Sequence, residues 1–525
     1  MPKRFWLFWL AAFLVALAFD FLFWNNAPGI SILIWVTLVL GTGIAVACSE
    51  GVKPSLRNII LIIAAIGMAF ITAFRSEPFT RFVALALSFA VLFILTHSYR
   101  KGYWIWFRIQ DHLTAFFRLI GALFSRGFGF IRNPKTPPAL PTEDRHKGRR
   151  ITFAILRGLL ISIPIIAVLA ALLASADPVF SSWLAKVFNI TRLPEYIFRL
   201  IYILIIAFIV TGAFLYAAFP RKEEQKPSDE QKIIKPFLGW IESVVILGLV
   251  DVLFLAFVFL QMRYLFGAQS NIVAEGYTYA EYARRGFFEL VTVAVLSLGL
   301  YLALGTVAKR EKPFRAHTFS GLALGLIALV LVILASSLQR LLLYERAYGF
   351  SRVRTYTHIF IFWLAGLLLA TAVLEILHEQ RWFALGLLVV VFGFGITLAA
   401  MNVDGFIVNQ NIARVTAGEK FDAGYISSLS DDAAPSIIQA FHSQDPKVTT
   451  KSIHDQLGAE LACRLFTLQN AKKVPWQSFN FGKLIAQNQL QAISAELKSY
   501  PTSQKDGMLF VKINGIEQNC SFTGD

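Results

Sequence analysis

Arginine, tyrosine and acidic side chains are concentrated in three short segments that border long apolar runs. In the first, EGYTYAEYARRGFFELV, Glu281, Arg285 and Glu289 follow one another at four-residue spacing, so a helix would bring their opposite charges together. Guanidinium groups bind phosphate or carboxylate through two parallel hydrogen bonds, and tyrosine rings stack on sugars or pack at lipid head groups. The alternative interpretation is an interfacial aromatic belt whose salt bridges fix the loops.

The other two segments repeat this chemistry. In QRLLLYERAYGFSRVRTYTH, Arg354 precedes His358 by four residues, and in NVDGFIVNQNIAR a helix would place Asp404 and Asn411 on one face. We expect the three segments on one side of a membrane, where they would bind an anionic ligand. The candidate binding residues are Tyr279, Glu281, Tyr282, Arg284, Arg285, Glu289, Arg340, Tyr344, Tyr348, Arg354, His358, Asp404, Asn411 and Arg414.

Asp251 is an ionisable residue in the middle of an apolar run, LGLVDVLFL. A charge near the bilayer centre costs about 2.5–3.5 kcal/mol, so it needs a reason. One reason is a proton or cation site in a transport path, and the other is a protonated or hydrogen-bonded residue that holds helices together. Glu242 lies nine residues away, on the opposite side of the same predicted helix, and cannot share a groove with it.

The elements that must position these residues are apolar runs of the length that crosses a bilayer. Hydrophobic residues make up 56% of the chain and charged residues only 16%, a balance that excludes an ordinary soluble protein. The sequence therefore predicts an all-α integral membrane protein with about eleven transmembrane helices. The predicted spans are Phe5–Trp24, Ile30–Cys48, Asn58–Phe74, Phe79–His97, Phe153–Ala174, Ile197–Phe219, Phe237–Gln261, Gly286–Ala308, Thr318–Leu338, Thr355–Leu377 and Trp382–Met401.

Basic residues decide the predicted orientation. Lys and Arg favour the connectors that share a side with the amino terminus, which places this terminus in the cytoplasm and the carboxyl-terminal part outside. The net charge of +16 is thus explained without nucleic acid binding. The predicted domains are 1–98, a four-helix membrane region, 99–152, a cytoplasmic interfacial helix with a basic Pro-rich loop, 153–401, a seven-helix membrane region, and 402–525, a small, mostly helical extracytoplasmic domain, called the tail below.

The tail and the interfacial segment carry two further predictions. Two cysteines in an oxidising compartment usually pair, which predicts a disulfide between Cys463 and Cys520. Tyr103–Ile131 is amphipathic and predicts a helix lying in the membrane interface, followed by the basic loop Asn133–Arg150. A helix through Phe441 and a short strand near Met508 are expected in the tail.

The three segments also suggest a relationship. YAEYARRGFFELV, RLLLYERAYGFSRVR and NVDGFIVNQNIAR with the downstream LSDDAAP resemble the family of bacterial polytopic membrane proteins catalogued as domain of unknown function 4173. The resemblance covers roughly Phe237 to Ile438. It implies the bacterial cytoplasmic (inner) membrane as the location, and it implies no activity and no site residues.

We interpret the chain as a binding or sensing platform for an anionic lipid, an envelope glycan or a protein partner on its extracytoplasmic face, in contact with the lipid bilayer. The alternatives are a secondary transporter that uses Asp251 and a transferase acting on lipid-linked phosphate substrates. No hydrolase elbow, Walker loop, HExxH or Cys/His metal spacing occurs, so we predict no catalytic residue, cofactor or metal, and enzymatic activity stays an open alternative.

Overall fold

The computed structural model describes residues 4–127, 193–219, 236–266, 287–310, 312–470, 474–505 and 508–520, with isolated stretches between 162 and 182. In these parts nine helices are long and apolar enough to cross a membrane, and a tenth, α3, is shorter. The predicted all-α membrane fold is therefore confirmed. The bundle helices are α1 (Phe5–Phe23), α2 (Ile30–Ser49), α3 (Asn58–Phe74), α4 (Pro78–Ser98), α9 (Leu193–Ala218), α10 (Trp240–Phe266), α13 (Phe287–Val307), α14 (Pro313–Tyr348), α15 (Arg352–Ile376) and α16 (Phe383–Met401).

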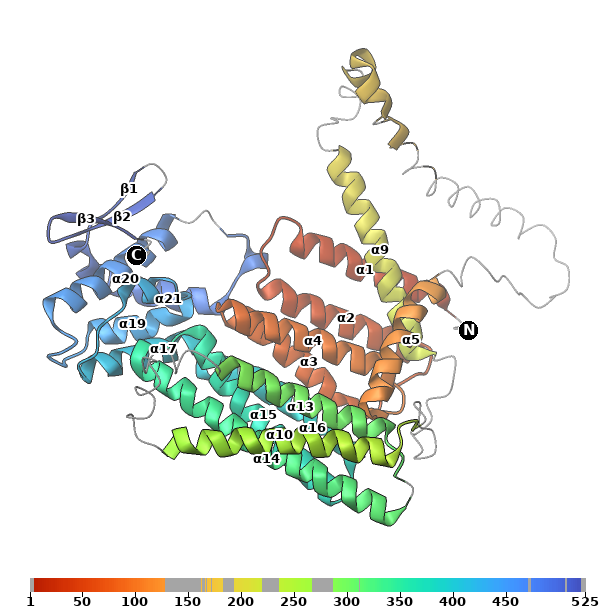
Figure 1. Cartoon of the computed structure of the whole chain (residues 1–525). Coiled ribbons are helices and arrows are strands. Elements are labelled where there is room, and N and C mark those ends of the chain that lie inside the picture. The colour runs from red at the N-terminus through yellow and green to blue at the C-terminus, as the bar shows by residue number, and fades with distance from the viewer. Residues whose placement is uncertain are drawn as a thin grey trace, which may run out of the picture.

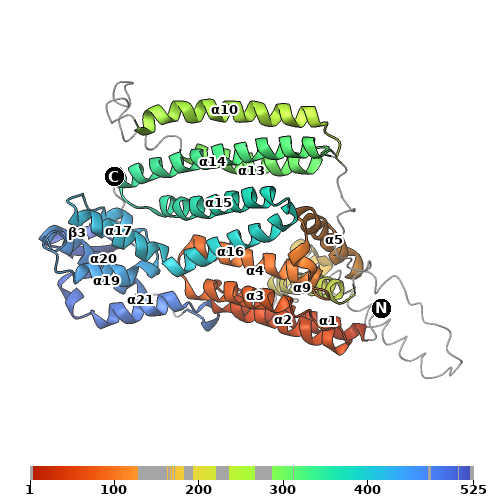
Figure 2. The same cartoon turned by 90° about the horizontal axis from the view of Figure 1, so that it is seen from below.

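Each of these ten helices corresponds to a predicted span. The remaining span, Phe153–Ala174, and the loop Asn133–Arg150 lie wholly or mostly outside the described residues. The helices run side by side, with the tail at one end of the bundle and the amino terminus at the other (Figure 1). The helices form two groups. The first group consists of α1–α4 and α9, and the second of α10 and α13–α16. The groups meet where α4 packs along α16 (Figure 2).

Helix α14 is much longer than its predicted span, because no Gly or Pro interrupts the sequence between Leu338 and Gly349. It has 36 residues, whereas about 20 suffice to cross a bilayer. It ends at Gly349, whose φ of 77° lies in the left-handed region that glycine tolerates. The helix therefore continues past the predicted span, and the last turns of α14 reach the tail.

The tail begins with a bend, since Asn402 has a φ of 49° and separates α16 from α17. The chain after Met401 therefore forms a separate helix and does not continue α16. Three antiparallel strands follow the helices, where one strand was expected, and Cys463 on α20 is joined to Cys520 with Cα atoms 5.8 Å apart. The elements are α17 (Val403–Thr416), α18 (Ala423–Ser427), η4 (Asp431–Ala433), α19 (Ala434–Phe441), α20 (Lys451–Asn470), η5 (Trp476–Ser478), α21 (Phe481–Ala492), η6 (Glu496–Ser499), β1 (Thr502–Lys505), β2 (Met508–Ile513) and β3 (Ile516–Asn519).

A short amphipathic helix, α5 (Ile109–Gly127), follows the 3₁₀ turn η1 (Tyr103–Trp106) at the end of the bundle away from the tail (Figure 1). It packs along α9 and α4 and leaves Leu113, Phe116 and Phe117 exposed. An exposed apolar stripe on such a helix is typical of contact with the interfacial layer of a bilayer. The helix expected for this segment is present, and its contact with the membrane interface stays a prediction.

Candidate functional site

The turn between α3 and α4 presents a buried carboxylate at the tail end of the bundle. Glu77 precedes Pro78, which is preorganised for the first position of a helix. Its carboxylate accepts the N–H groups of Phe79 at 2.9 Å and Thr80 at 2.6 Å, as an N-cap does. Glu77 is 2% exposed, and the Tyr356 hydroxyl of α15 donates a hydrogen bond to it.

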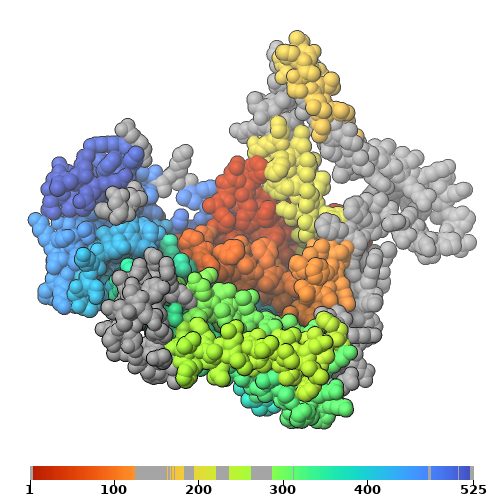
Figure 3. All heavy atoms as spheres, viewed as in Figure 1, coloured from red at the N-terminus to blue at the C-terminus, as the bar shows by residue number. Residues whose placement is uncertain are grey.

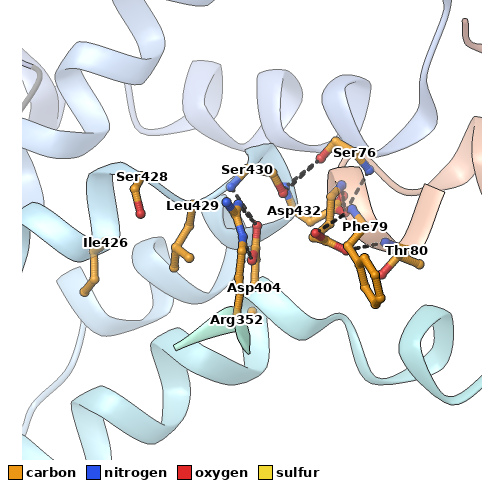
Figure 4. A network of polar contacts seen from close by, with 12 residues as sticks. Ser76, Phe79, Thr80, Arg352, Asp404, Ile426, Ser428, Leu429, Ser430 and Asp432 are labelled. Carbon is orange, nitrogen blue, oxygen red and sulfur yellow. Dashed lines mark hydrogen bonds and ion pairs between the residues drawn. The ribbon is translucent and has the colours of Figure 1, made fainter. Parts of the chain in front are cut away.

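The tail meets this turn through Asp432, at the start of η4. One Asp432 carboxylate oxygen accepts the N–H of Ser76 at 2.8 Å and that of Glu77 at 3.1 Å, while the Asp432 N–H donates to the Ser76 hydroxyl at 3.0 Å (Figure 4). Burial raises the pKa of Asp432, and these two backbone donors act in the opposite direction. The contact joins residues 356 positions apart.

A third buried carboxylate, Asp404 on the first turn of α17, binds Arg352 on the first turn of α15. The guanidinium donates two hydrogen bonds of 2.8 and 2.6 Å to the two carboxylate oxygens, and the N–H of Ser430 adds a third at 2.7 Å. Asp404 is 0% exposed. The backbone N–H of Arg352 donates to the hydroxyl of Tyr425, whose pKa is raised by burial.

Together these residues form what we call the tail junction: Ser76, Glu77, Arg352, Tyr356, Asp404, Ser430 and Asp432. Figure 4 shows Ser76, Arg352, Asp404, Ser430 and Asp432 of this group. Arg75 lies close enough for the charge of Asp432 to raise its pKa, although burial lowers it by more. The described residues contain no group of three or more His, Cys, Asp or Glu side chains that could hold a metal ion. The geometry is that of buried carboxylates that join the tail to both helix groups, and within the described residues it provides no paired nucleophile and base.

A second polar group, called the α14–α15 cluster, consists of Arg340, Tyr344, Glu345, Tyr348, Arg354 and His358. Arg354 lies over the Tyr344 ring at 4.0 Å and donates to the Gly349 carbonyl at the end of α14. His358 Nδ1 is 3.2 Å from a Glu345 carboxylate oxygen, and Glu345 is 2% exposed. The other carboxylate oxygen of Glu345 has no hydrogen-bond partner in the described part of the chain. This carboxylate fixes the orientation of the imidazole.

The other candidate binding residues do not form a single group in the described structure. Asn411 exchanges two hydrogen bonds with the Phe350 backbone, and Arg414 donates to the Arg346 carbonyl at 2.9 Å. Glu289 is exposed on the first turn of α13. The remaining five lie outside the described residues: Tyr279, Glu281, Tyr282, Arg284 and Arg285.

Asp251 lies on α10, where it faces α14. One of its carboxylate oxygens is 3.5 Å from the position that a Cβ on Gly325 would occupy. The other oxygen is buried and has no hydrogen-bond partner within the described ranges. The residue therefore packs between two helices, and no second ionisable side chain contacts it among those that the structure describes.

Sequence reasoning does not find four important residues: Glu77, Glu345, Arg352 and Asp432. A signal exists for Glu77, because an acidic residue before Pro marks a helix start. Ser430, two residues before Asp432, has the pattern of a helix cap, but nothing local indicates what the Asp432 carboxylate contacts. For Glu345 and Arg352 the partners come from other helices, and the sequence does not reveal them.

The comparison with known families shows which part of the chain matches a family. The model of the family described as a domain of unknown function (DUF4153) matches residues 62–440, which is most of the chain. The chain belongs to the DUF4153 family. The matched region begins in α3 and ends in α19, so it contains the entire tail junction and the α14–α15 cluster but not α20 or the sheet.

The expected relationship to domain of unknown function 4173 is wrong, because the family that matches is DUF4153. The motifs behind that expectation are short segments rich in arginine and tyrosine beside apolar runs, a composition that the membrane interface favours in many polytopic proteins. Neither the search of curated proteins nor the search of solved structures found a match.

Proposed function

We propose that this DUF4153 protein is a binding or sensing platform for an anionic ligand on the tail side of the membrane. The observation that supports the proposal most is the pairing of Arg354 and His358 on consecutive turns of α15, each held by its own partner on α14. Two oriented nitrogen groups of this kind suit a phosphate or carboxylate ligand.

The guanidinium of Arg354 is held in place but can still donate hydrogen bonds to a ligand. Among the described residues its one hydrogen-bond acceptor is the Gly349 carbonyl, and its face rests on Tyr344. The neighbouring Tyr348 is 55% exposed, so the cluster is open to ligands at its edge. An arginine fixed on an aromatic ring loses little side-chain entropy when it binds an anion.

The sensing part of the proposal depends on the connection between the cluster and the tail. Arg352 and Tyr356 belong to the tail junction, whereas Arg354 and His358 belong to the α14–α15 cluster, and all four lie on the first two turns of α15. A ligand that shifts these turns would strain the hydrogen bonds between Arg352 and Asp404. The tail would then report occupancy of the cluster.

The test uses phosphatidylglycerol as the anionic probe and native mass spectrometry of the detergent-purified protein. Arg354→Ala is expected to lower lipid retention about tenfold, since a hydrogen bond to a charged group contributes about 1.5–3 kcal/mol. Arg381→Ala is the matched control, because Arg381 is exposed in the connection between α15 and α16, at the ends of these helices away from the tail. Equal retention by both variants and the wild type would remove the proposal.

A specific observation favours a second candidate, proton or cation transport through Asp251. Its carboxylate oxygen is buried in a spanning helix and has no partner in the described regions. Proteoliposomes that enclose a pH-sensitive dye test this idea. Asp251→Asn is expected to abolish proton flux, whereas Glu242→Gln, on the exposed first turn of the same helix, keeps it. Flux in the wild type that equals that of empty liposomes excludes the candidate.

The orientation is part of the proposal: the tail lies outside the cytosol and the amino terminus inside, in a bacterial cytoplasmic membrane. The disulfide Cys463–Cys520 supports this, because such bonds persist in oxidising compartments. Cys48, near the opposite end, is free and exposed. In intact cells a membrane-impermeant maleimide is expected to label Cys48 only after permeabilisation. Labelling without permeabilisation would reverse the orientation.

A further inference from the structure

A short segment of the tail around η5 lies across the ends of the first membrane helices. The Trp476 ring is 6.2 Å from the ring of Phe21 on α1, and the Gln477 side chain donates to the Phe21 carbonyl at 3.5 Å. The Ile30 N–H at the start of α2 donates to the Phe479 carbonyl at 2.8 Å. This part of the tail is therefore held at the level where the helices leave the membrane.

The contact is close because Gly29 has no side chain. A Cβ at this position would lie 2.5 Å from the Phe479 carbonyl oxygen, which is closer than such atoms can approach. On the next turn, Phe481 packs against Phe70 and Phe74 of α3, with ring centroids 6.2 and 6.3 Å away. Backbone and ring contacts thus fix the distance between η5 and the bundle.

Three apolar side chains at this edge are left open. Val474 is 61% exposed, Trp476 is 55% exposed, and Phe21, the neighbour of Trp476, is 61% exposed. Phe21 lies in a membrane-spanning helix, so its exposed ring faces lipid. The exposed surface of Trp476 is continuous with this lipid-facing surface through the Phe21 contact.

The same end of the bundle carries an aromatic belt. Trp24 stacks on Tyr202 at 5.9 Å and lies 6.1 Å from Phe198, while Tyr196 is 55% exposed. Tryptophan and tyrosine are enriched at the membrane–water interface, because their rings are apolar and their N–H or O–H groups are polar. Trp476 extends the belt from α1 and α9 onto the tail.

We infer that Val474 and Trp476 form a membrane-contacting edge of the tail that inserts into the interfacial layer of the bilayer beside α1. The occupant of this apolar surface is the bilayer, because the edge continues a surface that the spanning helices already expose to lipid. Met508 and Ile516, two exposed apolar residues of the tail, lack this continuity, because they belong to the sheet, which lies at the far side of the tail from the bundle (Figure 1).

This edge gives the tail a second attachment besides the tail junction. The junction is polar and joins α17 and η4 of the tail to α15 and the α3–α4 turn, whereas the edge is apolar and follows α1 and α2. The space-filling view shows the tail abutting the end of the bundle, so both attachments act on one docked body (Figure 3). The inference does not depend on the proposed ligand.

Spin labels test the inference on the full-length protein in vesicles of phosphatidylethanolamine and phosphatidylglycerol. The background is Cys48→Ser, since Cys48 is the free cysteine of the described chain and the disulfide is unreactive without reductant. Labels are placed at Val474→Cys and Trp476→Cys, with Phe21→Cys as the lipid-facing reference and Met508→Cys and Ile516→Cys as water-facing references.

The measurement compares collisions of each label with oxygen, which concentrates in lipid, and with a polar nickel chelate. The ratio at Val474 and Trp476 is expected to resemble that at Phe21 and to exceed that at Met508 and Ile516. A ratio equal to the water-facing references overturns the inference. Dipolar broadening at Val474 that disappears on dilution with unlabelled protein would also overturn it, because a second copy would then cover the edge.

Discussion

The two ends of the helical bundle both bury carboxylates, but they connect different parts of the chain. At the tail end, Asp432 binds the backbone of Ser76 across 356 residues. At the other end, Glu375 of α15 is 0% exposed and accepts hydrogen bonds from Tyr301 and Ser320, which are 74 and 55 residues away. Arg310 is 3.6 Å from the same carboxylate. One network docks the tail on both helix groups, and the other fastens three consecutive helices.

The comparison shows that similar chemistry has a different role at each end. Buried charge pairs add little net stability, yet removal of one partner is costly because the other charge stays buried. At the tail end the cost would appear as release of the tail, and at the opposite end as loosening within the second helix group. The DUF4153 match includes both networks, so both belong to the family region.

The largest effect is expected from Asp404→Ala. The partly buried guanidinium of Arg352 would lose the carboxylate that it pairs with, and the N–H of Ser430 would lose its acceptor, at a total cost of about 3–5 kcal/mol. Hydrogen exchange of α17 and η4 in lipid nanodiscs should become much faster. The paired variant Arg352→Met with Asp404→Leu removes both charges and should recover most of the protection. Protection unchanged in Asp404→Ala would show that the tail junction does not hold the tail.

Removal of the disulfide separates internal stability of the tail from docking. Cys463→Ser with Cys520→Ser opens a loop between cysteines 57 residues apart, and we expect a loss of about 2–4 kcal/mol. The sheet and α20 should exchange faster, while Ser76 and Glu77 keep their protection, because their partner Asp432 lies outside the loop. Faster exchange at the α3–α4 turn would mean that the junction depends on the sheet.

A moderate effect is expected from Glu375→Gln at the opposite end. The amide keeps the shape but loses the charge opposite Arg310, which costs about 1.5–3 kcal/mol. Thermal unfolding in detergent should shift downward, with α13 and α14 losing protection and the tail remaining docked. Ser297→Ala on α13 is the control, since its hydroxyl donates to the Val293 carbonyl of its own helix. Release of the tail in Glu375→Gln would contradict the separation of the two networks.

The smallest effect concerns pH at Asp432. Burial raises its pKa above the ordinary 3.8, so the folded state favours the protonated form. Protonated Asp432 therefore stabilises the folded state below pH 3.8, and this contribution is lost as the pH rises through the raised pKa that Asp432 has in the folded state. Exchange at Ser76 and Glu77, corrected for intrinsic rates, should rise over this window, by up to about tenfold for each pH unit between the two pKa values. Asp432→Asn should abolish the dependence, and a dependence that persists would assign it to another group.

Several features can be predicted from the sequence because local composition decides them. The apolar runs identify the membrane helices, since every backbone polar group in lipid must be satisfied within its own helix. The amphipathic pattern of Tyr103–Ile131 locates α5, and Ser430 marks the start of η4 and α19. Tyr344, Arg354 and His358 belong to one candidate set because helical spacing repeats within their segment.

Other features cannot be predicted, because they depend on partners distant in the sequence. Arg352 looks like one more basic residue at a helix start, yet it binds Asp404, and Arg354 two residues later turns to Tyr344 instead. Glu345 gives no signal, although it orients His358. The bend at Asn402 separates α16 from α17 where hydrophobicity alone indicates a continuous extension.

By itself, the sequence determined that this chain is a helical membrane protein with a tail after Met401, because length and hydropathy of a run fix whether it can cross a bilayer. Only the tertiary structure decided what the tail is attached to and which charges are paired. The free energy of a buried carboxylate depends on donors within a few ångströms in space, and these come from α4, α15 and η4 alike. Spacing along the chain carries no information about contacts between residues that are distant in the sequence.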